Sequence, residues 1–235
     1  MNLKMIECSS GPKNSYLAAQ HLTGVNYVAP ADGAFIRRIF SSVRVANREV
    51  FVYFADSATG SNASVIFHLA DSAANRQSCI EDLWLYVPGG KYVLVYTVGE
   101  AADPYYLSDT TFSVLELEST EEFAAQTQRT YFVHNVPDNA YSSPILGNLA
   151  LVAPTGGACI KRVRGMVTAT NTVGYLYYAD DPDGGNANVM RGYAGGPLYA
   201  VVDFTEDCML IPAGKRLLAR SEIGRWSVAV TVEFE

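Results

Sequence analysis

The sequence VAPADGAFIRRIF at residues 28–40 returns as VAPTGGACIKRVR at residues 152–164. The correspondence continues without a gap: residues 28–95 align with residues 152–219 at a constant offset of 124, and 21 of these 68 positions are identical. So long a self-match indicates an internal repeat, and two copies of one fold are expected. The repeat also provides an internal control, because a residue that chemistry requires in both copies should be present in both.

Each copy has the pattern of short strands separated by turns. The first copy predicts strands at 35–45, 49–56, 63–69, a segment ending at Val87, 91–96 and 112–118, with a polar connection at 70–78. The second predicts strands at 158–168, 173–180, 187–193, 203–211, 215–219 and 226–235. The alternation of apolar and polar residues breaks once within 35–45, which indicates a β-bulge.

Helical periodicity does not extend over a useful length in either copy, so the pattern predicts an all-β fold. We expect two tandem homologous antiparallel β-sandwich modules of jelly-roll type, at residues 1–118 and 131–235. Residues 119–130 are expected to be a linker with room for one helical turn.

Composition limits the function. The 235 residues suffice for two domains of about 100 residues each, and the net charge of −7 with a pI near 5.0 disfavours binding to nucleic acid or to anionic membranes. The first residues lack the apolar core of a signal peptide, and no run approaches the roughly 20 apolar residues of a membrane span.

The four cysteines do not follow the repeat. Cys79 aligns with Asp203, Cys159 with Phe35 and Cys208 with Trp84, so the two copies share neither a disulfide plan nor a metal-ligand spacing. We therefore expect all four cysteines to be buried free thiols in a protein made in a reducing cytoplasm.

The copies differ before their last strand. Matching Glu116 and Glu118 to Glu233 and Glu235 changes the offset from 124 to 117, so the first copy has seven extra residues around 101–109. This loop holds Tyr105 and Tyr106. The two rings either pack over their own sandwich or face a partner, and packing is slightly favoured.

Catalytic residues are not indicated. The three histidines are His21, His68 and His134, and His68 aligns with Gly192. Nucleophile-elbow, paired-histidine and phosphate-loop motifs are absent from the sequence. We expect a protein that is not an enzyme.

The sharpest local motif is the loop DDPDGGN at residues 180–186, where Asp180, Asp183 and Asn186 offer the oxygen ligands that calcium prefers. Its counterpart in the first copy keeps an aspartate and an asparagine, Asp56 and Asn62, but lacks the other acids. A hairpin turn is therefore favoured over a calcium site, and no cofactor is expected, with calcium as the alternative.

Basic residues also recur. Arg37-Arg38 aligns with Lys161-Arg162. These pairs are expected to solvate a strand edge and to discourage aggregation, and a contact with a phosphate or a carboxylate is the alternative. Lys91 aligns with Lys215, directly after a turn glycine, and is interpreted in the same way.

Several segments together resemble a family of small β-sandwich proteins of tailed-phage virions, which serve as capsid decoration or cement proteins and as tail or baseplate accessories. The segments are a Val-Ala-Pro-x-x-Gly start (152–157), an Ile-x-Arg strand (160–163), a strand ending in Asp (175–180), an Ile-Pro-Ala-Gly-Lys turn (211–217) and a last alternating strand (228–235), with their first-copy equivalents. The resemblance covers nearly all of both modules. It implies a structural role without catalysis, usually as a trimer or another symmetric oligomer.

On this basis we expect a non-enzymatic virion protein that is assembled in the host cytoplasm and stabilises a phage particle by bridging subunits. Its partners would be the major capsid protein or other virion proteins and copies of itself, with a trimer favoured. Residues 1–16, with Tyr16, together with Tyr105 and Tyr106, are the expected contacts, because a sandwich does not require them. The alternatives are a small double jelly-roll capsid protein and a carbohydrate-binding adhesin of a tail or fibre, which would use Asp180, Asp183 and Asn186 beside a tyrosine.

Overall fold

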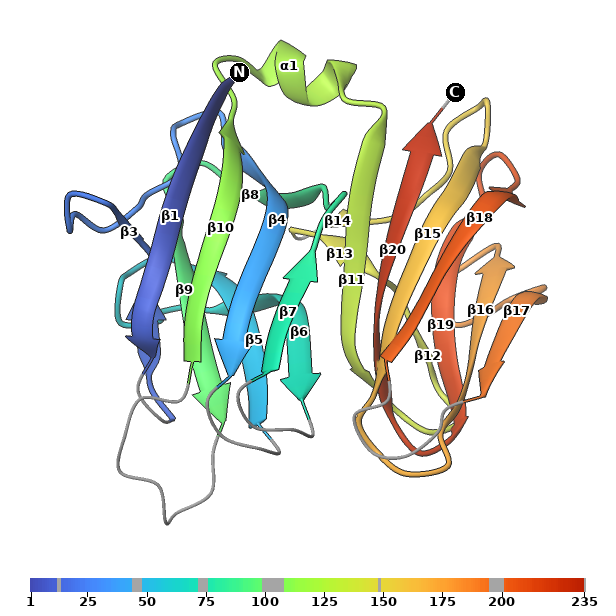
Figure 1. The fold of residues 1–235 in the computed structure, drawn as a ribbon. Helices are drawn as coiled ribbons and strands as arrows, with labels where there is room; N and C mark the ends of the chain where they lie inside the picture. Colours follow the sequence, from blue (N-terminus) through green and yellow to red (C-terminus); the bar gives the residue numbers. More distant parts are fainter. Residues whose placement is uncertain are drawn as a thin grey trace. The chain divides into compact units, whose positions relative to one another are not determined.

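The structure is a computed structural model that describes residues 1–11, 14–43, 48–71, 76–98, 108–147, 149–194 and 201–234 (Figure 1). The chain divides into unit 1, Met1–Gln126, and unit 2, Thr127–Glu235. Antiparallel strands dominate both units, so the prediction of an all-β fold is confirmed. Among the described residues, no helix is long and apolar enough to cross a membrane.

Unit 1 is built from a six-stranded and a four-stranded sheet. The first has the order β3-β1-β10-β4-β7, with β8 also paired to β4, and the second has the order β2-β9-β5-β6. The elements are β1 (Asn2–Gly11), β2 (Tyr16–Ala18), β3 (Gln20–His21), β4 (Ala34–Val43), β5 (Arg48–Ala55), β6 (Ser64–Asp71), β7 (Arg76–Ile80), β8 (Leu85–Val87), β9 (Tyr92–Val98), β10 (Ser108–Glu116) and α1 (Thr120–Ala125).

Unit 2 also contains a six-stranded sheet, in the order β14-β13-β11-β20-β15-β18, and a four-stranded sheet, in the order β12-β19-β16-β17. Its strands are β11 (Gln128–Val136), β12 (Tyr141–Ser142), β13 (Ile145–Leu146), β14 (Leu149–Ala150), β15 (Ala158–Val167), β16 (Val173–Ala179), β17 (Asn188–Ala194), β18 (Val201–Ile211), β19 (Arg216–Ile223) and β20 (Trp226–Phe234).

Alternation of side chains buries one face of each sheet. In β10, residues 108, 110, 112 and 114 are buried, and the residues between them are half-buried. This period of two is typical of a strand with one face on a core. Each unit is a β-sandwich, and Trp226 of β20 illustrates the core of unit 2, where it lies against Gly174 of β16 in the other sheet.

The predicted bulge is confirmed, and it occurs in both units. In β4, Ile36 pairs with Val114 and Arg38 with Ser113, so Arg37 is the extra residue. In β15, Ile160 pairs with Val232 and Arg162 with Thr231, which makes Lys161 the extra residue. The extra residue restores the alternation after the bulge, so that both Ile36 and Ile39 are fully buried.

The interpretation of the basic pairs as edge residues is wrong. β4 lies between β10 and β7, and β15 lies between β20 and β18, so both pairs are on interior strands. Their charges are balanced across neighbouring strands instead. Lys161 pairs with Glu233 at 3.0 Å, and Arg162 donates from two nitrogens to Asp203, each at 2.8 Å.

The register also corrects the predicted offset of the last strand. Val114 pairs with Ile36 and Val232 with Ile160, so an offset of 118 residues relates β10 to β20, against 124 for β4 and β15. Unit 1 therefore has six extra residues rather than seven. Matching by glutamate slipped the alignment by one residue, which would place every side chain of the strand on the opposite face.

The premise that a sandwich does not require residues 1–16 is wrong. β1 pairs with both β10 and β3, and Ile6 and Cys8 are buried.

In the expected linker at 119–130, Ser119 caps α1 by accepting a hydrogen bond from the backbone N–H of Glu122, and Phe123 stacks on Phe35 with ring centroids 5.7 Å apart.

Candidate functional site

A polar contact at the β5–β6 hairpin of unit 1 recurs at the β16–β17 hairpin of unit 2. The carboxylate of Asp56 pairs with Lys91 and accepts a hydrogen bond from Asn62 Nδ2 at 2.7 Å. The carboxylate of Asp180 pairs with Lys215 and accepts from Asn186 Nδ2 at 2.6 Å. Hydrogen bonds from the lysine and the asparagine hold the pKa of each aspartate below its ordinary value.

The candidate calcium loop is organised by these contacts. Lys215 supplies the positive charge beside Asp180, and Asp181 Oδ1 accepts hydrogen bonds from the backbone N–H groups of Asp183 and Gly185 at 3.0 and 2.8 Å. Asp183 is exposed. Among the residues that the structure describes, no group of three His, Cys, Asp or Glu side chains is placed to hold a metal ion. These contacts are those of a hairpin turn.

Acid should weaken this contact. Because the folded pKa values of Asp56 and Asp180 are lowered, their stabilising contribution is present above the unfolded pKa and is lost as pH falls through the folded pKa. We expect the double variant Lys91→Met/Lys215→Met to lose less thermal stability than the parent between about pH 5 and pH 2. Melting curves at several pH values test this, and parallel pH profiles would contradict it.

A tyrosine–glycine contact lies beside each of these hairpins. The rings of Tyr16 and Tyr53 meet edge to face at 5.2 Å and 89°, and those of Tyr141 and Tyr177 meet with the same distance and angle. Gly60 touches the first pair: it has φ +89°, and a Cβ there would lie 2.3 Å from the ring of Tyr16. Gly184 stands in the same relation to Tyr141, with φ +87° and a distance of 2.2 Å.

Tyr16 therefore contacts residues of its own unit. Its ring packs on Tyr53 of the four-stranded sheet and on Gly60 of the β5–β6 hairpin loop. It also lies 5.0 Å from Tyr96, ring centroid to centroid. Tyr105 and Tyr106 lie outside the described residues.

The histidines occupy unrelated environments. His68 is buried, stacks on Phe51 at 4.1 Å, and places Nε2 2.8 Å from a carboxylate oxygen of Glu49. Burial lowers the pKa of His68. His134 Nδ1 lies 2.9 Å from Ser227 Oγ, on other strands. The three histidines therefore do not repeat as a constellation.

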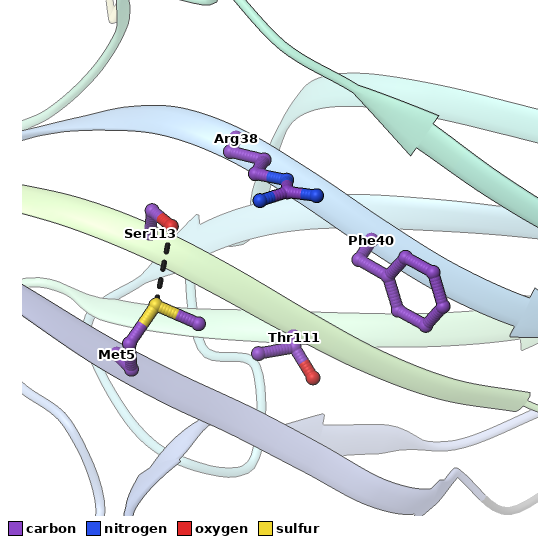
Figure 2. A pocket seen from close by; sticks show the side chains of 5 residues that line it. All are labelled: Met5, Arg38, Phe40, Thr111 and Ser113. Atoms are coloured by element: carbon purple, nitrogen blue, oxygen red, sulfur yellow. Dashed lines mark hydrogen bonds between the residues drawn. The ribbon is translucent and has the colours of Figure 1, made fainter.

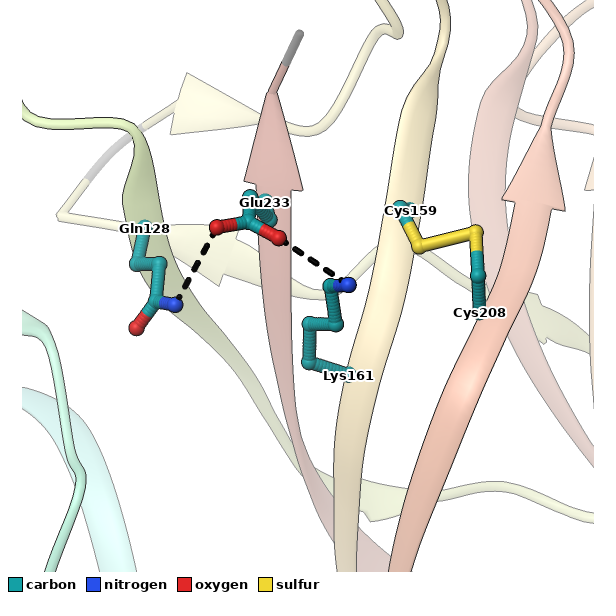
Figure 3. The surroundings of a disulfide bond; sticks show 5 residues. All are labelled: Gln128, Cys159, Lys161, Cys208 and Glu233. Atoms are coloured by element: carbon teal, nitrogen blue, oxygen red, sulfur yellow. Dashed lines mark hydrogen bonds and ion pairs between the residues drawn. A yellow bond between two sulfur atoms is a disulfide. The ribbon is translucent and has the colours of Figure 1, made fainter.

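The prediction of four buried free thiols is wrong in two respects. Cys159 and Cys208 form a disulfide between β15 and β18 (Figure 3). Cys79 and Cys208 are exposed, whereas Cys8 is buried and free as expected. The equivalents of the bonded pair, Phe35 and Trp84, are in contact in unit 1 with ring centroids 5.6 Å apart. One contacting pair has thus replaced another.

A shallow open pocket of about 200 Å³ lies on the outer face of the larger sheet of unit 1 (Figure 2). The surface that contains it, which we call the β1–β10–β4 face, comprises Leu3, Met5, Arg38, Phe40, Thr111 and Ser113. Leu3 and Met5 are 64% and 48% exposed. Sequence reasoning selected the segment 1–16 that holds these two residues, but it did not find the contribution of β4 and β10.

No protein-family model matches this chain, and no curated protein matches it. Similar solved structures include the PBSX exported protein XepA, with 14% identity, a TM-score of 0.24 and coverage of 89% of this chain and 85% of that chain. The viral particle of infectious bursal disease virus (T13) gives 11% identity and a TM-score of 0.23, over 99% of this chain and 65% of that chain. A fucolectin from striped bass serum gives 8% identity and a TM-score of 0.26, over 86% and 79%. Similarities this low carry no argument about function.

Proposed function

We propose that this protein is a non-enzymatic structural component of a phage virion, built from two tandem homologous jelly-roll-like sandwiches. It stabilises the particle as a decoration, cement or accessory protein that bridges neighbouring subunits. Its partners are the major capsid protein or other virion proteins and further copies of itself, and it needs neither a cofactor, a nucleic acid nor a membrane.

This proposal rests on a comparison of the two units, which shows the contacts that recur in both. The Asp56 and Asp180 contacts and the tyrosine–glycine contacts recur, and each closes the fold of its own unit. Groups suited to acid–base chemistry, such as His68 with Glu49, occur in one unit alone, since Gly192 and Val173 take their places in the other. The duplication keeps contacts that stabilise the fold and does not keep a set of reactive side chains, and this favours a structural role.

The β1–β10–β4 face is the docking surface that we assign to a virion partner. Its exposed Leu3 and Met5 and its pocket beside Phe40 offer apolar area, and Arg38, which pairs with Glu81 at 3.2 Å, also lines the pocket. Burial of such a surface at many lattice positions gives firm attachment even when each contact is weak.

Sedimentation tests this function. We expect the protein to travel with intact particles in a density gradient, and we expect Met5→Glu to reduce its occupancy at least tenfold, because the variant would bury a charge in the contact. Leu149→Glu, at a residue that is 62% exposed in unit 2, is the matched control and should keep full occupancy. Absence of the protein from purified particles would refute the proposal.

The carbohydrate-binding adhesin is distinguished by calcium. Because Lys215 already pairs with Asp180, thermal melts with calcium and with a chelator should coincide. A large stabilisation by calcium that is abolished by Asp183→Ala would replace the structural role with the adhesin.

A further inference from the structure

The edge strand β18 of unit 2 is long and undivided, with one bulge: Thr205 pairs with Arg162 and Met209 with Ile160, so the register shifts between them. It runs for 11 residues, Val201–Ile211, and in the described part of the chain it pairs with β15 alone (Figure 1). The equivalent edge of unit 1 is divided into β7, with five residues, and β8, with three, by residues 81–84. Short, broken edge strands are a common protection against pairing with another chain. Unit 1 has that protection, whereas the edge of unit 2 is one undivided strand whose regular pairing is interrupted by the bulge at residues 206–208.

Apolar side chains lie near both ends of this edge. Val201 and Leu210 are 67% and 58% exposed. Val201 replaces the polar Gln77 of unit 1, and Leu210 replaces Tyr86, whose ring packs 4.6 Å from that of Phe123. Val201 pairs with Met166 and Leu210 with Cys159, and the bulge between Thr205 and Met209 places both on the outer face of the sheet although they are nine residues apart.

Two acids of the edge, Asp203 and Glu206, pair with arginines of the same chain. Asp203 accepts hydrogen bonds from Arg162 at 2.8 Å and lies 3.5 Å from Arg164 Nε, and Glu206 pairs with Arg191. Partial burial acts to raise the pKa of Asp203, but the arginines outweigh it and the pKa is lowered. These two pairs reduce the like-charge repulsion that a second edge of the same kind would meet.

The edge is complementary to itself. The sequence VVDFTEDCML at residues 201–210 has two apolar residues at each end and mainly polar residues between them, so it has a similar pattern when read in reverse. We propose that β18 pairs antiparallel with β18 of a second copy across a two-fold axis, with Val201 of each copy opposite Leu210 of the other. A two-fold contact uses the same surface on both subunits, and a self-complementary strand meets that requirement.

The side chains behind the edge hold it in place. Phe204 packs against Tyr193 of β17 with ring centroids 5.4 Å apart, and the Cys159–Cys208 disulfide ties β18 to β15. An edge that is already ordered loses little conformational entropy on pairing. The proposal does not depend on the virion role, and it predicts a two-fold dimer in place of the trimer that the family resemblance implies.

Sedimentation velocity of the full chain tests the proposal. We expect a concentration-dependent species of twice the 25.5 kDa monomer mass, and we expect Val201→Lys and Leu210→Lys each to raise the dissociation constant at least tenfold, since lysine on an edge opposes pairing. Gln77→Lys, at the equivalent position of unit 1, is the matched control and should leave the dimer intact. Unchanged melting temperatures would establish that the variants fold.

Cross-linking gives a second measurement that does not rely on loss of binding. In a Cys79→Ser background, copies carrying Val201→Cys mixed with copies carrying Leu210→Cys should form a heterodimeric disulfide under mild oxidation, because opposed residues of paired strands bring their Cβ atoms within about 5.5 Å. A chain that is monomeric at all concentrations, or an oligomer that neither lysine weakens, would overturn the proposal.

Discussion

Loss of the Cys159–Cys208 disulfide is expected to reduce the free energy of unfolding of unit 2 by about 4 kcal/mol. The two cysteines are 49 residues apart, and the cross-link limits the conformations of the unfolded chain across that whole loop. For a unit of this size, such a loss corresponds to a fall in melting temperature of roughly 15 °C. Hydrogen exchange read by mass spectrometry should place the loss of protection in residues 127–234 and leave unit 1 unchanged.

Variants separate the cross-link from the thiols. Cys159→Ser/Cys208→Ser should reproduce the effect of a reductant, whereas Cys79→Ser, which removes an exposed free thiol, should have none. The variant Cys159→Phe/Cys208→Trp installs the pair that occupies this place in unit 1 and should recover part of the stability through ring contact. Four reactive thiols in the denatured, unreduced protein would show that the disulfide does not form.

The repeat made much of this fold predictable. The strands around Ile36, Val163 and Phe112 were found because a half-buried strand alternates with a period of two, and the bulge was found because that alternation breaks. A hairpin turn at Asp180 was favoured over a calcium site because the corresponding loop of the first copy keeps the turn residues and lacks the extra acids.

The disulfide was missed because each cysteine was compared with its counterpart singly. Phe35 and Trp84 align with Cys159 and Cys208, and a contact in one copy implies proximity in the other. The replacement of one contacting pair by another was thus the feature of the sequence that could have indicated the disulfide. β1 and β11 were missed for a different reason: both lie outside the aligned segments, and their pairing partners are distant in sequence.

The position of Trp226 in the core is a second case in which contacting residues differ together between the two units. Trp226 pairs with Val167, and its equivalent Ser108 pairs with Val43, so the indole replaces a small side chain. The two residues that face the ring, Gly165 and Gly174, stand where unit 1 has Ser41 and Val50. All of these positions are buried. A gain in volume on β20 is therefore offset by losses on β15 and β16.

Gly174→Val, which restores the residue of unit 1, is expected to destabilise unit 2 by about 3 kcal/mol, because well-packed cores tolerate little added volume. A Cβ at residue 174 would lie 2.4 Å from the ring of Trp226, which is only 2% exposed and has no room to move. Gly165→Ala, with a corresponding distance of 3.2 Å, is the matched control and should cost about 1 kcal/mol.

The reciprocal change makes the test specific. Trp226→Ser alone should leave a cavity that costs about 4 kcal/mol, yet the double variant Gly174→Val/Trp226→Ser should be more stable than either single variant, because valine fills the space that the indole leaves. Unit 1 holds this combination already, with Ser108 hydrogen-bonded to Thr97 at 2.7 Å, and Ser221 stands at the position of Thr97 in unit 2. Chemical denaturation of the four proteins gives the coupling energy. Additive effects would mean that the two sites do not share one packing space, and the residue-by-residue equivalence of the two cores would then fail at this position.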